Sequence, residues 1–169
     1  MAEVKSEKVT SENINFDELK HEVINDYQLA VESRETSLLG RREVLTGKAK
    51  FGIFGDGKEL PQIALAKQFK NGDFRSGYYR DQTLMMAIGN LNIKEFFAQL
   101  YANPSVEAEP ASAGRQMNAH FASRSIDENG DWKNLMEMKN SAADTSPTAS
   151  QMPRLLGLSY ASKFYKENK

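Results

Sequence analysis

The chain has 169 residues, a nearly balanced charge with a formal net value of −1, and no cysteine. The missing cysteine excludes disulfide bridges, thiolate zinc sites and cysteine nucleophiles, and the evenly spread Lys and Arg residues give no reason to expect nucleic acid or an anionic membrane as partner. No apolar run approaches the roughly 20 residues that cross a bilayer, and the charged N-terminus lacks the apolar centre of a signal peptide, so we expect a cytoplasmic protein.

Helical periodicity dominates the first part of the chain, after a polar and charged tail that we expect to be flexible at residues 1–14. From Phe16 onward, apolar residues recur at steps of three and four. This spacing predicts a long amphipathic helix with its polar face outward. Asn15 is positioned to cap the helix in a capping box, and the region of Gly40 and Gly47 is expected to end it.

The tripeptide Gly55-Asp56-Gly57 admits two interpretations. The same three letters begin the metal and diphosphate motif of thiamine-dependent enzymes, which closes with paired asparagines further along the chain. No Asn-Asn pair follows here, and the preceding residues make a poor apolar strand. We therefore interpret the tripeptide as a turn before a second helix from about Leu60 to Phe69, with Pro61 in its first turn.

The stretch from Ser76 to Met85 suggests an anion site. A strand over Gly77–Tyr79 that gives way to a helix near Asp81 would place free backbone N–H groups beside the Arg80 guanidinium. Together these groups suit a phosphate or a diphosphate. The alternative is that Arg80 and Asp81, an Arg beside an Asp at a helix start, only form a capping and salt-bridge arrangement.

Two short helices and an irregular segment follow. Residues 84–88 and 93–101 have Met and aromatic residues at helical spacing, which indicates core rather than a cofactor site. Residues 103–134 contain prolines, small residues and turn signals, and a loop of this length is usually functional or disordered. Within this loop, His120 is either a packed or surface residue or a catalyst, whereas His21 is expected to face solvent.

The last predicted helix follows a turn crowded with hydroxyl groups, from Asp144 to Pro153. Pro153 falls in the first turn of the helix, and Gly157 would let the helix pack closely against a neighbour. The Ser and Thr oxygens of the turn suit a hard cation or a bound ring. An ordinary N-cap explains them as well.

Three short elements in a fixed order carry a family resemblance: Tyr79-Arg80-Asp81, then Gly114-Arg115-Gln116-Met117 with His120, then Ser146-Pro147 with Gln151, Pro153, Gly157 and Tyr160-Ala161. Over residues 16–166 the chain resembles the N-terminal part of the alpha subunit of thiamine-diphosphate-dependent 2-oxoacid dehydrogenases, the decarboxylating component. The Gly-Arg-Gln-Met element favours the branched-chain type. The resemblance implies an α/β fold, with residues 15–169 as a mostly helical N-terminal fragment of a three-layer thiamine-diphosphate-binding domain.

The resemblance also implies chemistry and site residues. In this family thiamine diphosphate enables the decarboxylation of a 2-oxo acid, and the acyl group passes to a lipoyl-bearing acyltransferase. Carried over by position, Tyr79 and Arg80 contact the diphosphate, and Ser146 and Thr148 lie along the aminopyrimidine ring. The potassium-binding turn of branched-chain members is matched by Thr145, Pro147, Ser150 and Gln151.

The chain also departs from the family pattern. Asn118 stands where the family often has proline, Arg154 where it often has glutamine, and Thr148 where branched-chain members tend to have an aliphatic residue. The magnesium ligands and a catalytic histidine would lie beyond residue 169, and the activating glutamate belongs to a beta subunit or a fused beta half. We therefore expect this chain to be inactive alone and to associate into an oligomer.

A function of a different class also fits the sequence. The chain could be a non-catalytic helical interaction module that shares the fold but not the chemistry, because a fold does not dictate a function.

Overall fold

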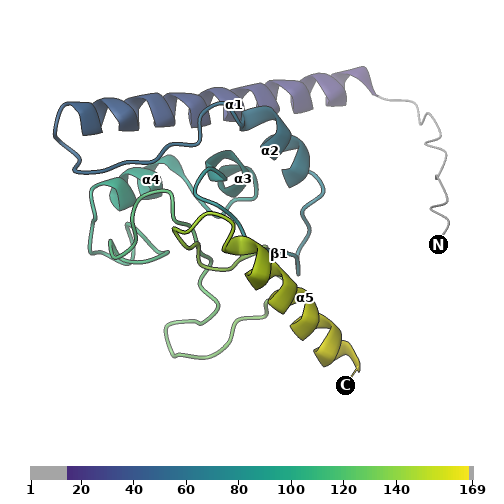
Figure 1. The fold of residues 1–169 in the computed structure, drawn as a ribbon. Coiled ribbons are helices and arrows are strands. Elements are labelled where there is room, and N and C mark those ends of the chain that lie inside the picture. The colour runs from purple at the N-terminus through teal and green to yellow at the C-terminus, as the bar shows by residue number, and fades with distance from the viewer. Residues whose placement is uncertain (1–14, 168–169) are drawn as a thin grey trace.

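The computed structural model describes residues 15–167, which form helices and irregular segments with one two-stranded sheet (Figure 1). The predicted tail at residues 1–14 lies outside this range. The elements are, in order, α1 (Phe16–Leu45), α2 (Glu59–Ala66), β1 (Phe74–Arg75), α3 (Gln82–Ala87), α4 (Ile93–Leu100), β2 (Asn140–Ser141) and α5 (Gln151–Glu167). β1 and β2 pair in parallel, with Arg75 opposite Ser141. This helix-rich structure with a parallel strand pair is compatible with the α/β fragment that the sequence predicts.

Capping signals account for the ends of the long first helix and of α4. Asn15 is the N-cap of α1 and accepts a hydrogen bond from the Asp17 N–H at 3.1 Å. The helix ends one turn after Gly40, and Gly47 follows with a φ of +77°. A complete capping box starts α4, between Asn92 and Glu95.

Strand pairing occurs before Gly77–Tyr79, so the prediction of a strand there is wrong. The parallel pair forms at β1, where the Asn140 N–H donates to Asp73 O and the Ala142 N–H donates to Arg75 O, both at 2.9 Å. After β1 the Arg75 side chain lies against the following backbone, where its Nη2 donates to Tyr78 O at 2.9 Å. A Cβ atom at Gly77 would lie 1.9 Å from Arg75 Cζ, so only glycine leaves room for the guanidinium.

The predicted orientation of α1, with its polar face outward, is also wrong. Its exposed side includes Val23, Ile24 and Tyr27, which are 56%, 51% and 70% exposed. The buried residues of the helix are all small: Ser33, Thr36, Ser37 and Gly40. Small residues allow α1 to approach the segment below it closely, and their hydroxyl groups supply the hydrogen bonds of the contact.

The contact between α1 and α3 is made by these polar groups. The Ser33 and Thr83 hydroxyl oxygens lie 2.7 Å apart, and Gln82 Nε2 donates to Ser33 O at 2.9 Å. The Ser37 hydroxyl donates to Gln82 Oε1 at 3.2 Å. The apolar side of α1 is therefore left facing outward.

The core consists of two apolar clusters on the inner side of α1. One contains Ala66, Leu84, Met85, Ile88, Ala119 and Phe121. The other contains Ala49, Phe54, Phe96 and Leu100. Met85 and Phe96 are fully buried, which confirms that the Met and aromatic residues of the two short helices are core. His21 is exposed, as predicted.

The C-terminal helix α5 projects away from the rest of the chain (Figure 1). It has no buried residue, and nothing lies within 4 Å of the position that a Cβ atom of Gly157 would occupy. The close packing predicted for Gly157 is therefore not present in the described residues.

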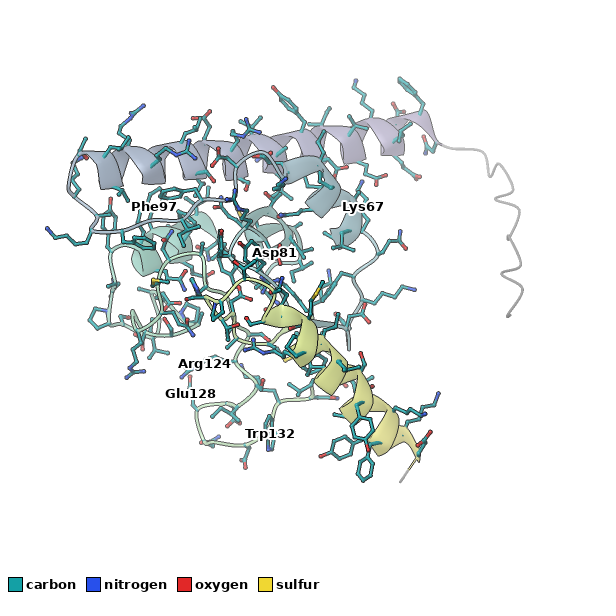
Figure 2. The ribbon with its side chains drawn as sticks, in the orientation of Figure 1. Lys67, Asp81, Phe97, Arg124, Glu128 and Trp132 are labelled. Carbon is teal, nitrogen blue, oxygen red and sulfur yellow. The ribbon has the colours of Figure 1, made fainter. Side chains whose placement is uncertain are left out.

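Trp132, on the irregular segment after α4, is also exposed (Figure 2). No helix within residues 15–167 combines the length and apolar character needed to cross a membrane.

Candidate functional site

Arg80 has a fixed backbone and an exposed side chain. Its carbonyl oxygen accepts a hydrogen bond from Gln62 Nε2 at 2.8 Å, and Gln62 Oε1 accepts one from the Leu84 N–H at 2.9 Å. A Cβ atom on Gly55 would lie 2.8 Å from Arg80 O, so glycine permits this close approach. Among the residues that the structure describes, the Arg80 guanidinium forms no ion pair with Asp or Glu. Its charge is therefore available to an external anion.

Two tyrosines lie beside this guanidinium. The Tyr78 and Tyr79 ring centroids are 3.9 Å apart, and Arg80 Cζ lies 5.4 Å from the Tyr79 ring centroid. Hydrogen bonding to Tyr78 and, after it, to Arg80 lowers the pKa of the Tyr79 phenol. Hydrogen bonding to Tyr79 in turn raises the pKa of Arg80. Phenols next to a guanidinium form a set of donors that suits phosphate oxygens.

Asp81 pairs with Arg75 and not with its neighbour Arg80. Arg75 Nη2 lies 2.9 Å from Asp81 Oδ2, and Arg75 Nε donates to the same oxygen at 3.0 Å. Asp81 is the N-cap of α3 by position, but its side chain makes no capping hydrogen bond. The salt bridge at this helix start is therefore formed by Asp81 with Arg75, and Arg80 takes no part in it.

The buried Arg75 connects this turn to the hydroxyl-rich turn that begins after Asp144. Arg75 Nη2 lies 3.0 Å from Asp144 Oδ2, and Nη1 donates to the Ser141 hydroxyl at 2.7 Å. Asp144 Oδ2 also accepts a hydrogen bond from the Phe121 N–H at 3.0 Å. Neither Arg75 nor Asp144 is among the site residues predicted from the sequence. Gly77 is the one local sign of this arrangement, because it leaves space for the guanidinium.

His120 is buried, so the surface alternative for this residue is wrong. Its Nε2 lies 3.0 Å from the Ser146 hydroxyl oxygen, and its Nδ1 lies 3.2 Å from Asn118 O. A carbonyl oxygen can only accept, so in the neutral ring Nδ1 carries the proton and Nε2 accepts from the Ser146 hydroxyl. The structure thus brings His120 together with a residue expected to contact the cofactor.

The residues expected to bind potassium lie around one turn. The Thr145 and Ser150 hydroxyls are hydrogen-bonded to each other, and the Ser150 N–H donates to Pro147 O at 3.2 Å. The Ser76 hydroxyl donates to Gln151 O at 2.9 Å, which joins this turn to the Arg80 turn. Each carbonyl oxygen keeps a second lone pair.

Thr148, at the tip of the same turn, is exposed. It is followed by Ala149 with a φ of +69°. Within the described range no group of three or more His, Asp or Glu side chains is placed to hold a metal ion. A potassium site of hydroxyl, carbonyl and amide oxygens is a different set of ligands and stays a prediction.

The segment at Gly55-Asp56-Gly57 is a turn before α2, as predicted. Asp56 Oδ1 pairs with Arg41 Nη2 at 2.6 Å, and Gly57 has a φ of +93°. Glu59 accepts two hydrogen bonds from Arg34, at 2.6 and 2.9 Å. The hydrogen bond to Arg34, aided by the backbone N–H of Gly57, lowers the pKa of Glu59 to about 2. These carboxylates serve structural ion pairs.

Asn118, at the position where the related family often has proline, joins two loops. Its Nδ2 donates to Ile53 O at 3.0 Å, and its Oδ1 accepts from the Ile53 N–H at 2.9 Å. Ala119 follows with a φ of +57° and is fully buried. This departure therefore has a structural role in holding the segment that carries His120.

Comparison with known proteins relates the chain to one group of enzymes. No family model matches it. It is 30% identical over 149 residues to the 2-oxoisovalerate dehydrogenase subunit alpha of Bacillus subtilis (strain 168), which covers 83% of this chain and 40% of that relative. It is also 26% identical over 122 residues to the mitochondrial 2-oxoisovalerate dehydrogenase subunit alpha of Caenorhabditis elegans. This alignment covers 72% of this chain and 24% of that relative. The chain spans less than half the length of these curated relatives. The similarities support a relation to alpha subunits of branched-chain 2-oxoacid dehydrogenases.

Proposed function

We propose that this chain is the N-terminal portion of the decarboxylating component of a branched-chain 2-oxoacid dehydrogenase and contributes part of a thiamine diphosphate site. The observation that carries the proposal is the Arg80 guanidinium, which has no carboxylate partner within the described residues. The backbone carbonyl of Arg80 is held by Gln62 and lies against Gly55. The similarity to two alpha subunits of 2-oxoisovalerate dehydrogenase supports the same family.

The residues around Arg80 fit a diphosphate. A planar guanidinium can bind two phosphate oxygens at once, and the Tyr79 phenol adds a further donor. Asp81 would repel an anion, but it is ion-paired with the buried Arg75, which it shares with Asp144. The two arginines and two carboxylates sum to zero, so it is the exposed Arg80 guanidinium, which has no carboxylate partner within the described residues, that attracts an anion here.

The hydroxyl-rich turn would serve the other end of the cofactor. In the proposal Ser146 and Thr148 lie along the aminopyrimidine, and His120 fixes the direction of the Ser146 hydroxyl. Thiamine diphosphate, when bound, supplies the carbon nucleophile and electron sink for decarboxylation of a 2-oxo acid. The residues of this chain would bind and orient it, and a potassium ion on the same turn would hold the turn in place through Thr145, Pro147, Ser150 and Gln151.

The proposal needs groups from outside the chain. Magnesium ligands would come from the part of the protein that the matched relatives have in addition, and the activating carboxylate would come from a beta subunit or a fused beta half. The acyl product would pass to a lipoyl-bearing acyltransferase. We propose a cytoplasmic location for this assembly.

The test is calorimetric titration of thiamine diphosphate with magnesium into the product of the whole reading frame, together with its beta part. We expect Arg80→Ala to weaken binding at least about tenfold, because it removes charge-assisted hydrogen bonds to phosphate. Arg42→Ala, which removes an exposed arginine of α1, is the matched control and should bind like the wild type. Equal affinities of the Arg80→Ala and wild-type proteins would contradict the proposal.

The exposed apolar side of α1 favours a second candidate, the non-catalytic helical interaction module. Val23, Ile24 and Tyr27 are more than half exposed on this helix. In that case Arg80→Ala should leave partner binding unchanged, whereas Ile24→Asp should abolish it. Thiamine diphosphate binding that depends on Arg80 would rule out a purely structural module.

A further inference from the structure

The tripeptide Asn-Gly-Asp occurs twice in the chain, at residues 71–73 and at residues 129–131. The asparagine is exposed in both copies. In an Asn-Gly pair, the backbone nitrogen of the glycine can attack the side-chain amide carbon of the asparagine, because glycine has no Cβ atom to hinder the approach. Since the two copies are identical in sequence, a difference between them in the folded chain reports on their surroundings.

The second copy lies at the tip of a hairpin. Ile126 and Trp132 form an antiparallel bridge, and both residues are exposed. Figure 2 shows Glu128 and Trp132 on a loop that extends away from the body of the chain. A Cβ atom at Gly130, where φ is +88°, would have nothing within 4 Å. Within the described chain, this glycine is therefore open on that side.

The hydrogen bonds that hold this tip stay within the turn. In the part of the chain that the structure describes, Asn129 and Gly130 bond only to Asp127. The Asn129 N–H donates to Asp127 Oδ1 at 2.8 Å, and the Gly130 N–H donates to Asp127 O at 3.3 Å. The turn can therefore open without disturbing another element, and its opening frees the Gly130 nitrogen.

The first copy is attached to a distant part of the chain. The Gly72 N–H donates to Met138 O at 2.9 Å, and the Asn140 N–H donates to Asp73 O at 2.9 Å, next to the pairing of β1 with β2. A Cβ atom at Gly72 would lie 3.1 Å from Met136 Cε. This glycine is therefore both hydrogen-bonded and covered.

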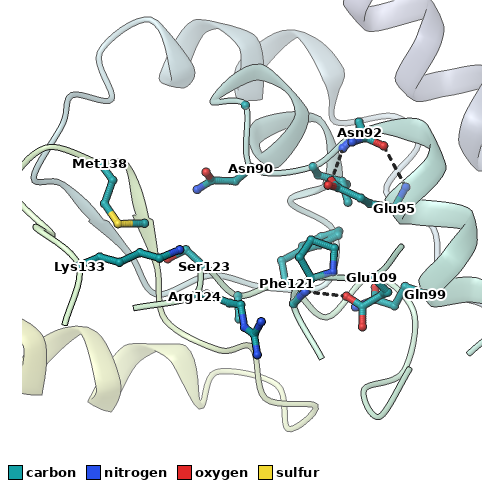
Figure 3. A pocket seen from close by; sticks show the side chains of 15 residues that line it. Asn90, Asn92, Glu95, Gln99, Glu109, Phe121, Ser123, Arg124, Lys133 and Met138 are labelled. Carbon is teal, nitrogen blue, oxygen red and sulfur yellow. Dashed lines mark hydrogen bonds between the residues drawn. The ribbon is translucent and has the colours of Figure 1, made fainter. Parts of the chain in front are cut away.

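The acceptor of the Gly72 bond is itself held in place. Met138 and Asn90 line a cavity of about 410 Å³ beside the start of α4 (Figure 3). Asn90 Nδ2 donates to Lys139 O at 2.9 Å, which holds the segment at Met138. Release of the Gly72 nitrogen therefore requires this segment to separate from the first copy, beside the strand pair.

We propose that Asn129 is a site of spontaneous deamidation and that the fold protects Asn71 from the same reaction. The Gly130 nitrogen forms a bond to the Asn129 side-chain carbon, the carbon–nitrogen bond of the amide breaks, and ammonia leaves with the proton of the Gly130 N–H. Water then opens the cyclic imide at one of its carbonyl carbons. The products are aspartate and isoaspartate, in which the chain continues through the side chain. This inference is independent of the proposed cofactor site.

The reaction would change the hairpin. It adds a negative charge beside the carboxylates of Asp127, Glu128 and Asp131, and like charges repel. Isoaspartate also lengthens the backbone between Ile126 and Trp132, which shifts the register of their bridge. Both changes loosen the hairpin.

The test is incubation of the 169-residue chain in mildly alkaline buffer, followed by trypsin digestion and mass spectrometry. Trypsin cleaves after Lys and Arg, so the two asparagines fall on separate peptides, residues 71–75 and 125–133, and each is the only amide side chain of its peptide. We expect Asn129 to react at least about fivefold faster than Asn71, because the net value of one hydrogen bond corresponds to about this factor in an opening equilibrium.

The same chain unfolded in guanidinium chloride is the matched control. The two copies then differ only in their flanking residues, so Asn71 and Asn129 should react at similar rates. Asn129→Gln, at an exposed position, should leave peptide 125–133 unmodified in the folded chain. Amide hydrogen exchange measured by NMR is a second readout, in which the Gly130 N–H should exchange faster than the Gly72 N–H.

Three results would overturn the inference. The first is equal reaction of Asn71 and Asn129 in the folded chain, or equal exchange of the two glycine N–H groups. The second is an Asn129 that stays intact in the folded chain while the unfolded chain reacts. The third is a difference between the two asparagines that persists after unfolding, because the flanking residues and not the fold would then be its cause.

Discussion

Arg75 and Arg80 lie on the same turn of the chain and have opposite environments. The Arg75 residue is 5% exposed and pairs with Asp81 and Asp144, whereas Arg80 is exposed and pairs with no carboxylate of the described residues. A guanidinium is removed from water at high cost unless carboxylates and hydrogen-bond acceptors surround it. One arginine therefore fixes the turn, and the second, which the turn positions, keeps its charge for a ligand.

Substitution of Arg75 should produce the largest effect. Arg75→Met would leave Asp144, which is 4% exposed, buried without its cation. We expect the free energy of unfolding to fall by about 3–5 kcal/mol, measured by urea denaturation. Adding Asp144→Asn to Arg75→Met should restore part of the loss, because the unpaired charge is then removed. A loss below about 1 kcal/mol would show that Arg75 is not structural.

A third arginine, Arg34, has an environment between those of Arg75 and Arg80. Its side chain is partly exposed, but it pairs with the buried Glu59. The pKa of Glu59 is about 2 in the folded chain and near the ordinary value of 4.5 when unfolded, so the folded state binds the proton less tightly. This pair therefore stabilises the fold above about pH 4.5, by up to about 3 kcal/mol, and the contribution disappears as the pH falls toward 2.

Urea unfolding at a series of pH values measures this contribution. Glu59→Gln should be less stable than the wild type at pH 7, and the difference should narrow as the pH is lowered. A difference that stays constant between pH 7 and pH 3 would contradict the assignment of the low pKa to Glu59.

Substitution of Arg80 should have little effect on folding. Arg80→Met should change the free energy of unfolding by less than about 0.5 kcal/mol, because the side chain is exposed and the backbone contacts to Gln62 do not involve it. Thermal unfolding of the two variants in parallel, Arg75→Met and Arg80→Met, tests the comparison directly. Equal destabilisation by both would remove the distinction between them.

The smallest expected effect is on the titration of Tyr79. Its pKa is lowered mainly by Tyr78 and, after it, by Arg80. Tyr78→Phe should therefore raise the pKa of Tyr79 toward its ordinary value, and Arg80→Met should raise it less. NMR titration with labelled tyrosine measures both shifts. A larger rise in Arg80→Met than in Tyr78→Phe would reverse the assigned causes.

Helix positions could be predicted from the sequence because the signals are local. Pro61, Gly89 and the periodic apolar residues mark α2, α3 and α4, and Met85 and Phe96 occupy the core as the spacing predicts. The face that α1 buries could not be predicted this way. Apolar periodicity marks a side of the helix, but the contact with α3 uses Ser33 and Ser37 instead.

The arrangement of the candidate site depends on contacts between distant parts of the chain. Arg75 and Asp144 are 69 residues apart, and the two strands that bring them together have two residues each, too short for a periodic signal. The contact between His120 and Ser146 likewise needs the folded chain. Sequence resemblance could name Arg80 and Ser146 as site residues, but not the buried pair that joins their turns.

The hydroxyl contact between α1 and α3 has a consequence for how the structure responds to temperature. Exposure of apolar surface raises the heat capacity on unfolding, whereas exposure of polar surface lowers it. Because the contact of α1 with α3 is made through Ser33, Ser37 and Gln82, breaking this contact should carry a small heat-capacity change. The apolar clusters beneath α1 lose driving force on cooling, whereas this hydroxyl contact should lose far less. In the cold, the polar contact with α3 should therefore contribute a larger share of what holds α1 to the core.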